Sequence, residues 1–300
     1  MEVLSLNQKQ LGILCKFHID NLRKFQSLPI RTATAVIYLL IGAMPIEAEI
    51  HKRQISFLHN ILNCNNDNIR ALTDRQLIMN VNNPQSFLCR ASATLEIYNL
   101  PTITELKTNL PSKLNWKKAI KLFWTEHLQK MLQDKTSLRN VNTKDLKVGS
   151  THLVWTSLPS NVADIRKGIT KCRMLTVTYL VQKDKHRFSN GRVDPICPRC
   201  GVGDEDIEHM LTRCSALHCI RKDQFTRFKE LVVSYIGTDA WLPSQTFNSM
   251  ESLIVKLILD CTTFGYMFDS GTKLKNIMLQ STELCYKMHV HRVWKMKDYE

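Results

Sequence analysis

Apolar residues recur at helical spacing along almost the whole chain. One stripe of a predicted helix consists of Leu11, Leu14, Cys15, Ile19, Leu22 and Phe25. Residues 35–41 are apolar on every side, which is typical of a helix buried at the centre of a core. The same periodicity predicts helices over residues 45–62, 69–79, 86–100, 112–133, 162–181, 217–236, 250–264 and 274–294. Strand-like alternation is rare, so we expect a mainly α fold.

Prolines suggest where the helical pattern is interrupted. Pro101 and Pro111 bracket a stretch that we interpret as a linker and module boundary. We therefore divide the chain into a helical region over 1–100, a basic helical region over 101–196, a cysteine-rich segment over 197–220 and C-terminal helices over 221–300. The uncharged, mostly apolar stretch over residues 32–46 is shorter than the roughly 20 residues of a membrane-spanning helix, so we expect no membrane partner.

Charge is unevenly distributed along this pattern. The chain carries a net charge of +14, and residues 101–200 contribute +12 of it. This basic middle predicts a polyanionic partner, RNA or DNA before a membrane. The candidate phosphate-binding residues are Lys117, Lys118, Lys121, Arg166, Lys167, Lys171, Arg173, Lys183, Lys185, Arg187 and Arg192. Trp155, Tyr179 and Phe188 are candidates to stack on unpaired bases, while Trp116 and Trp124 fall on an apolar helix face and are expected in the core.

Cysteine usage points to a reducing compartment. The first residues show no basic-then-apolar pattern of a secretory leader, so we expect an intracellular protein, cytoplasmic or nuclear or both. Most of the ten cysteines stand singly among apolar residues, as small buried hydrophobic side chains do. In such a compartment, paired cysteines favour a metal over a disulfide.

One segment has the spacing of a metal site. Its candidate ligands are Cys197, Cys200, His209 and Cys214, which can surround Zn²⁺ as a tetrahedral CCHC knuckle. Four protein ligands leave no position for a reactive water, so the predicted Zn²⁺ is structural. The fold class we expect is thus a set of helical bundle modules with a small CCHC zinc-knuckle insertion.

Details of the spacing make further predictions for this knuckle. Gly201 and Gly203 allow the positive φ that a tight knuckle turn requires. His209 and Cys214 are five residues apart, so an unbroken α-helix would separate them by roughly 140°, and we expect the helix to end between them. His218 and Cys219 are close enough in sequence to be alternative ligands.

Sequence patterns of common enzymes are missing. There is no His-x-Glu before the Cys-x-x-Cys, no His-Glu-x-x-His, no phosphate-binding loop and no Gly-x-Ser-x-Gly. The densest acidic group, Asp204, Glu205, Asp206 and Glu208, is interpreted as a solvated helix start rather than as a two-metal nuclease site. We predict no catalytic residue and no small-molecule substrate.

Several blocks resemble a known family. Residues 173–182 (RMLTVTYLVQ), 186–188 (HRF), 194–200 (DPICPRC) and 205–214 (EDIEHMLTRC) are similar to the zinc-binding region near the C-terminus of non-LTR, jockey-like retrotransposon reverse transcriptases. Residues 31–35 (RTATA) and 39–54 (LLIGAMPIEAEIHKRQ) resemble the helical segment after the polymerase palm of the same elements. The resemblance implies that Cys197, Cys200, His209 and Cys214 are the zinc ligands and that the chain grips RNA template or target DNA.

The chain also departs from that family. The aromatic-x-Asp-Asp turn of the polymerase is absent, as are endonuclease and RNase H motifs, so the RNA-directed DNA polymerase activity of the full-length polyproteins is not carried over. Three interpretations stay open: a zinc-stabilised nucleic-acid-binding tail, a protein-interaction domain shaped by its zinc knuckle, and a retroelement remnant without function.

Overall fold

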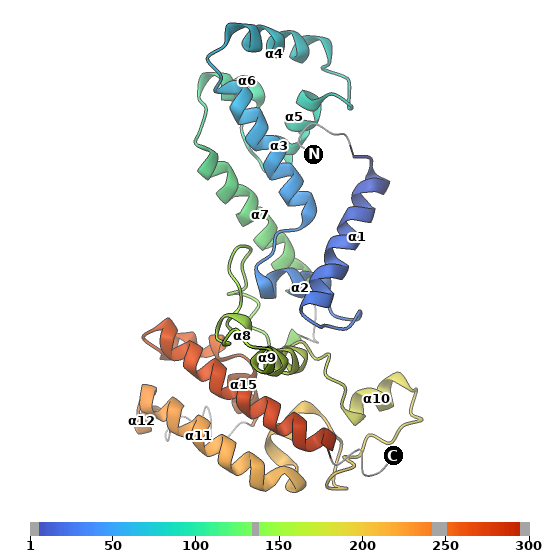
Figure 1. Ribbon diagram of the computed structural model, residues 1–300, viewed down its shortest axis with the longest axis vertical. Coiled ribbons are helices and arrows are strands. Elements are labelled where there is room, and N and C mark those ends of the chain that lie inside the picture. Colours follow the sequence, from blue (N-terminus) through green and yellow to red (C-terminus); the bar gives the residue numbers. More distant parts are fainter. Residues whose placement is uncertain (1–5, 134–137, 242–250, 295–300) are drawn as a thin grey trace.

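The computed structural model describes residues 6–133, 138–241 and 251–294, and it is elongated along one axis (Figure 1). About 70% of it is helical, and within these ranges there is no β-strand, which confirms the mainly α prediction. Two isolated β-bridges join Lys147 to Ser150 and Ile196 to Asp204.

The N-terminal lobe, α1 to α7, forms the upper part of Figure 1. Its helices are α1 (Gln8–Phe25), α2 (Thr34–Ile41), α3 (Ile46–Leu62), α4 (Asp67–Met79), α5 (Phe87–Ile97), α6 (Ile103–Thr108) and α7 (Lys113–Gln133). The predicted central helix is confirmed, because every residue from Ala35 to Leu40 is buried. The predicted linker contains the unpredicted α6, whose buried Ile103 and Leu106 follow a capping box made by Thr102 and Glu105.

The C-terminal lobe, α8 to α15, forms the lower part of Figure 1. It consists of α8 (Leu153–Thr156), α9 (Val162–Leu175), α10 (Gln182–Phe188), a π-helical turn η2 (His209–Arg213), the 3₁₀ turn η3 (Ser215–Leu217), α11 (His218–Ile236), α12 (Thr238–Trp241), α14 (Glu251–Leu259), the 3₁₀ segment η4 (Cys261–Met267) and α15 (Gly271–Trp294). The long α15 packs against α8, α9, α11 and α14 and is the centre of this lobe.

Three predicted helices end earlier than the periodicity suggests, and the one predicted over 86–100 stops at Ile97. The helix predicted over 162–181 stops at Leu175 because Val177 adopts a left-handed φ of 53° and the N–H of Thr178 bonds the Arg173 carbonyl at 2.8 Å. The helix predicted over 250–264 gives way to η4 after Leu259, and its predicted first residue, Met250, lies outside the described residues.

The chain between α7 and α8 ties the two lobes together. The N–H of Gly149 donates to the Gly42 carbonyl (2.7 Å) and that of His152 to the Leu40 carbonyl (2.9 Å). Gly42 has a φ of 66°, and a Cβ placed on it would lie 2.7 Å from the backbone of Ser150, so this close approach requires glycine. On the other side, the N–H of Asn142 donates to the buried carboxylate of Asp260 at 2.8 Å.

Packing crosses the first predicted domain boundary. Helix α7 lies against α2 and α3, although the sequence analysis assigns it to the basic region over 101–196. The division into four regions otherwise stays a prediction.

Among the described residues, no single helix combines the length and apolar character needed to cross a membrane. Helices α2 and α3 taken together, bent by 58° at the break between them, have that length and composition.

Candidate metal centre

The turn that carries the first two cysteines is built from backbone hydrogen bonds. The N–H of Cys197 donates to the Gly203 carbonyl, and the N–H of Gly201 donates to the Cys197 carbonyl, both at 2.9 Å. Gly201 and Gly203 have φ values of 65° and 72°, so both glycines adopt the positive φ predicted for them. This turn brings the Cys197 and Cys200 sulfurs within 4.8 Å of each other.

A π-helical turn brings His209 and Cys214 together. Asp206 caps the short helix by accepting the N–H of His209 at 2.8 Å, as the sequence predicts for this acidic segment. The last helical residue is Arg213, so the helix ends between His209 and Cys214 as expected. Its last turn, however, widens into a π turn, in which the N–H of Cys214 bonds the His209 carbonyl at 2.8 Å, five residues back. Because a π turn closes over five residues, it returns Cys214 to the side of His209, which an α-helix would not do.

The four predicted ligands form one cluster. The candidate ligand atoms of Cys197, Cys200, His209 and Cys214 all lie within 4.8 Å of one another. Cys197 Sγ is 3.9 Å from Cys214 Sγ, and Cys200 Sγ is 3.3 Å from His209 Nε2. His218 and Cys219, the predicted alternatives, are exposed at the start of α11 and do not belong to the cluster. The cluster can therefore hold a metal ion.

The electrostatics of the cluster fit a cation. Burial and, after it, the neighbouring thiols of Cys197 and Cys200 together raise the pKa of Cys214 to about 12. Burial also raises the pKa of Cys197 and lowers that of His209, which favours the neutral imidazole that metals bind. Burial opposes ionisation of Cys200 as well, but the Val202 N–H and the adjacent thiols outweigh it and leave its pKa below the usual value. A divalent cation would supply the charge that stabilises the buried thiolates.

A buried ion pair fixes the knuckle to the rest of the lobe. Glu205 accepts two hydrogen bonds of 2.7 Å from Arg292 of α15, and the two side chains are only 2% and 6% exposed. Glu205 also accepts the N–H of Gln182 at 2.9 Å, and Arg292 reaches the hydroxyl of Tyr179 at 3.4 Å. The sequence interpretation of Glu205 as part of a solvated helix start is wrong, because its carboxylate lies inside the lobe.

Each of the other carboxylates of the acidic group also has a cation beside it. Lys183 Nζ lies 3.5 Å from Asp204 and 3.4 Å from Asp206, and Glu208 pairs with Arg213. These carboxylates are matched by protein cations, which agrees with treating the group as structural rather than as a two-metal nuclease site.

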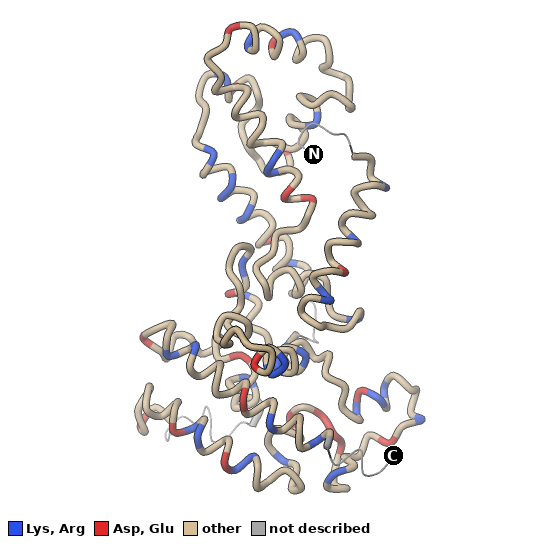
Figure 2. Tube along the Cα trace, viewed as in Figure 1, with Lys and Arg blue, Asp and Glu red and all other residues tan. Residues whose placement is uncertain are grey.

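The predicted basic residues separate into groups. Lys117, Lys118 and Lys121 lie exposed on α7, where the described residues place no carboxylate within ion-pair distance of them. Lys183, Arg187 and Arg192 are exposed, and Lys185 half-buried, on α10 and the chain after it. Figure 2 shows the α7 lysines on the upper lobe and the α10 cations on the lower one, so the structure does not join them into one surface.

The basic residues of α9 are mostly engaged within the protein. Arg166 is exposed, but Lys167 pairs with Asp164 (2.9 Å) and Glu283 (2.7 Å). The guanidinium of Arg173 donates to the carbonyl of Ser27 at 2.9 and 2.6 Å.

Lys171 is the clearest departure from the predicted set. It is fully buried, and its ammonium donates to the carbonyl of Met278 and the hydroxyl of Ser281. No part of its ammonium is left for a phosphate to reach, so we drop it from the candidate interface.

The candidate stacking residues also differ in how far they are buried. Tyr179 is buried, and its hydroxyl contacts His289 at 2.8 Å. Trp155 is half-buried beside Gly168. Phe188 is exposed at the end of α10. Of the two tryptophans predicted in the core, Trp116 is buried, and Trp124 is half-buried with its N–H donating to Tyr98.

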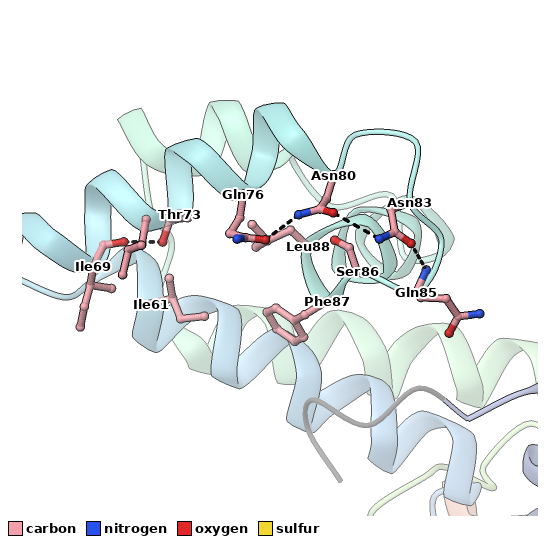
Figure 3. Close-up of a pocket in the computed structure, with 11 residues that line it drawn as sticks. Ile61, Ile69, Thr73, Gln76, Asn80, Asn83, Gln85, Ser86, Phe87 and Leu88 are labelled. Atoms are coloured by element: carbon pink, nitrogen blue, oxygen red, sulfur yellow. Dashed lines mark hydrogen bonds between the residues drawn. The ribbon is translucent and has the colours of Figure 1, made fainter.

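Two cavities bear on the chemistry. One, of about 670 Å³, opens beside the metal cluster and is lined by Cys200 and His209 together with Lys183 and Arg213. The other, of about 450 Å³, lies between α3, α4 and α5, where Gln76, Asn80 and Asn83 form a hydrogen-bonded chain over an apolar floor (Figure 3). The residues that line this second cavity include no carboxylate, imidazole, thiol or amine, so it offers no acid–base catalyst.

The comparisons with known proteins add no relative. No family model matches the chain, and neither a curated protein nor a solved structure matches it.

Proposed function

We propose that the chain is a zinc-stabilised nucleic-acid-binding module. The four-ligand cluster is the observation that carries the first part. Three thiolates and one imidazole are a soft donor set, which favours Zn²⁺ over the oxygen-seeking Ca²⁺ and Mg²⁺. With four protein ligands the ion would be structural, and it would hold the segment between α10 and α11 in the folded arrangement.

The basic surface of α7 supports the nucleic-acid part. Lys117 and Lys121 are one helical turn apart, about 6 Å along the axis, and Lys118 lies beside them. Their exposure leaves the ammonium groups available to displace counterions from a phosphate backbone. The resemblance of residues 173–214 to the zinc-binding region of non-LTR reverse transcriptases agrees with this role, and we propose kinship with that region on those motifs.

Salt dependence of binding tests the proposal. Replacing Lys117, Lys118 and Lys121 together by Ala is expected to reduce the slope of log affinity against log salt by about 2 for single-stranded DNA. A matched control replaces Lys9, Lys16 and Lys24, three exposed lysines of α1, and removes the same charge. An equal loss of slope in both variants, or absence of binding by the wild type at low salt, would overturn the proposal.

An exposed apolar surface favours protein docking as a second candidate. Large exposed side chains gather on α4 and just after it: Ile69, Leu72, Ile78, Met79 and Val81. If docking is the function, replacing Ile78 and Val81 by Ser would abolish association between protein molecules while leaving nucleic-acid affinity unchanged. Sedimentation of the wild type and this variant, each with and without an oligonucleotide, separates the two functions.

A further inference from the structure

Phe188 is an exposed aromatic residue with two arginines close to its ring. It is the last residue of α10 and is 54% exposed. The guanidinium carbon of Arg31 lies 5.0 Å from the centre of its ring, and that of Arg187 lies 4.9 Å from it. Arg31 precedes α2, so the two arginines come from different lobes. The contact is therefore specified by the tertiary fold and not by α10 alone.

Both guanidiniums are oriented by the protein. Arg31 Nη2 donates to the carbonyl of Thr178 at 2.7 Å, and Arg187 Nη2 donates to the carboxylate of Asp184 at 3.1 Å. A guanidinium has five N–H donors, and the described residues accept no other hydrogen bond from either arginine. The remaining donors are available to an external acceptor without a large loss of side-chain entropy on binding.

The surroundings combine apolar and cationic groups. Ile30, next to Arg31, and Leu180 are both exposed. Arg192 is exposed a few residues beyond Phe188. The acidic groups on this segment are Asp184, which takes one donor of Arg187, and the exposed Asp194. Cations thus outnumber carboxylates on the segments that carry the ring and its two arginines.

We propose that Phe188, Arg31 and Arg187 form a stacking site for an unpaired base of single-stranded nucleic acid, with the guanidiniums binding the adjoining phosphates. The inference rests on the proposed nucleic-acid function and names its ligand. Aromatic rings and guanidinium planes both stack on base faces, and arginine forks bind phosphate. In a duplex the base faces are covered by their neighbours, so this site selects single strands.

The test compares single-stranded and duplex probes of one sequence. The probe is an oligonucleotide of about 12 nucleotides carrying 2-aminopurine, whose fluorescence falls when the base stacks, alone or annealed to its complement. Replacing Phe188 by Leu is expected to weaken single-strand binding by roughly 5- to 150-fold, to abolish the fluorescence change and to leave duplex affinity unchanged. Phe188→Tyr keeps an aromatic ring and is expected to retain both the single-strand affinity and the fluorescence change of the wild type.

The matched control is Phe17→Leu, which removes an exposed ring of α1 that has no arginine over it among the described contacts. Thermal unfolding of each variant checks that the fold is unchanged. The stacking site is overturned if Phe188→Leu leaves single-strand binding unchanged, weakens single-strand and duplex binding equally, or behaves as Phe17→Leu does. A wild type that binds neither probe would overturn the proposed function itself, which distinguishes the two failures.

Discussion

The carboxylate of Glu205 and the guanidinium of Arg292 form a bidentate ion pair, with both hydrogen bonds at 2.7 Å, between the segment that carries the candidate ligands and α15. The two residues are 87 positions apart in sequence. Because Glu205 lies between the second and third candidate ligands, the pair connects the geometry of the metal site to the central helix of the lobe.

Breaking this pair from one side should destabilise the lobe strongly. Arg292→Met leaves the Glu205 carboxylate buried without a counterion, which is expected to reduce the free energy of unfolding by about 3–5 kcal/mol. Glu205→Gln combined with Arg292→Met should lose less than Arg292→Met alone, because no uncompensated charge remains. On the same helix, Lys287→Met breaks a surface pair with Glu283 and should change stability by less than about 1 kcal/mol. Urea unfolding of the three variants measures these differences.

The same pair predicts a pH dependence. Burial alone would raise the pKa of Glu205, but the hydrogen bonds and charge of Arg292 outweigh it and hold that pKa below its usual value. The stabilisation is therefore complete above the ordinary Glu pKa of about 4.3 and is lost as the pH falls through the lower folded value. Unfolding temperatures measured from pH 7 down to pH 3 should fall more steeply for the wild type than for the double variant. Parallel curves would contradict this.

Gly42 should tolerate no side chain. Gly42→Ala requires a left-handed residue with a Cβ and forces the backbone of Ser150 to move, so we expect a loss of at least about 2 kcal/mol. Gly12→Ala is the control: Gly12 lies within α1, nothing lies within 4 Å of a Cβ placed there, and the change should stabilise the protein by about 0.5–1 kcal/mol. Equal effects of the two substitutions on urea unfolding would refute the close approach of Gly42 to the backbone of Ser150.

Lys171 should lower stability at neutral pH. Burial lowers the pKa of its ammonium, so the unfolded chain binds the proton more tightly than the folded protein does. The free energy of unfolding therefore rises with pH, up to the ordinary lysine pKa, as far as this residue contributes to it. Lys171→Met removes that penalty. The variant's advantage over the wild type in free energy of unfolding should be greatest near pH 7 and shrink toward pH 10. An advantage that stays constant or grows with pH would contradict the buried, destabilised ammonium.

Local signals in the sequence account for most of the fold. The apolar periodicity places α2, α3, α7 and α15 within a few residues of their observed bounds, since those helices bury one face or all faces. Helix α6 had a usable signal, the Thr102–Glu105 capping box, which the prolines on either side obscured. The end of α9 had none, because its left-handed residue is Val177 where glycine is usual.

The candidate metal site was predictable in composition but not in conformation. Spacing alone selects Cys197, Cys200, His209 and Cys214 as candidate ligands, and the structure brings these four together. Spacing cannot show that a π turn joins His209 and Cys214, because two residues five positions apart on an α-helix point in different directions. Nor could the burial of Glu205 and Lys171 be predicted, because their partners, Arg292 and Ser281, lie far along the chain.

Metal content of the purified protein tests the central claim most directly. We predict about one zinc per chain by mass spectrometry, lost in Cys200→Ser and retained in Cys219→Ser, which changes a cysteine outside the cluster. Loss of zinc should lower the unfolding temperature, because metal binding and folding of the knuckle are coupled. Zinc retained in Cys200→Ser, or metal-free protein that unfolds at the wild-type temperature, would contradict a structural zinc centre.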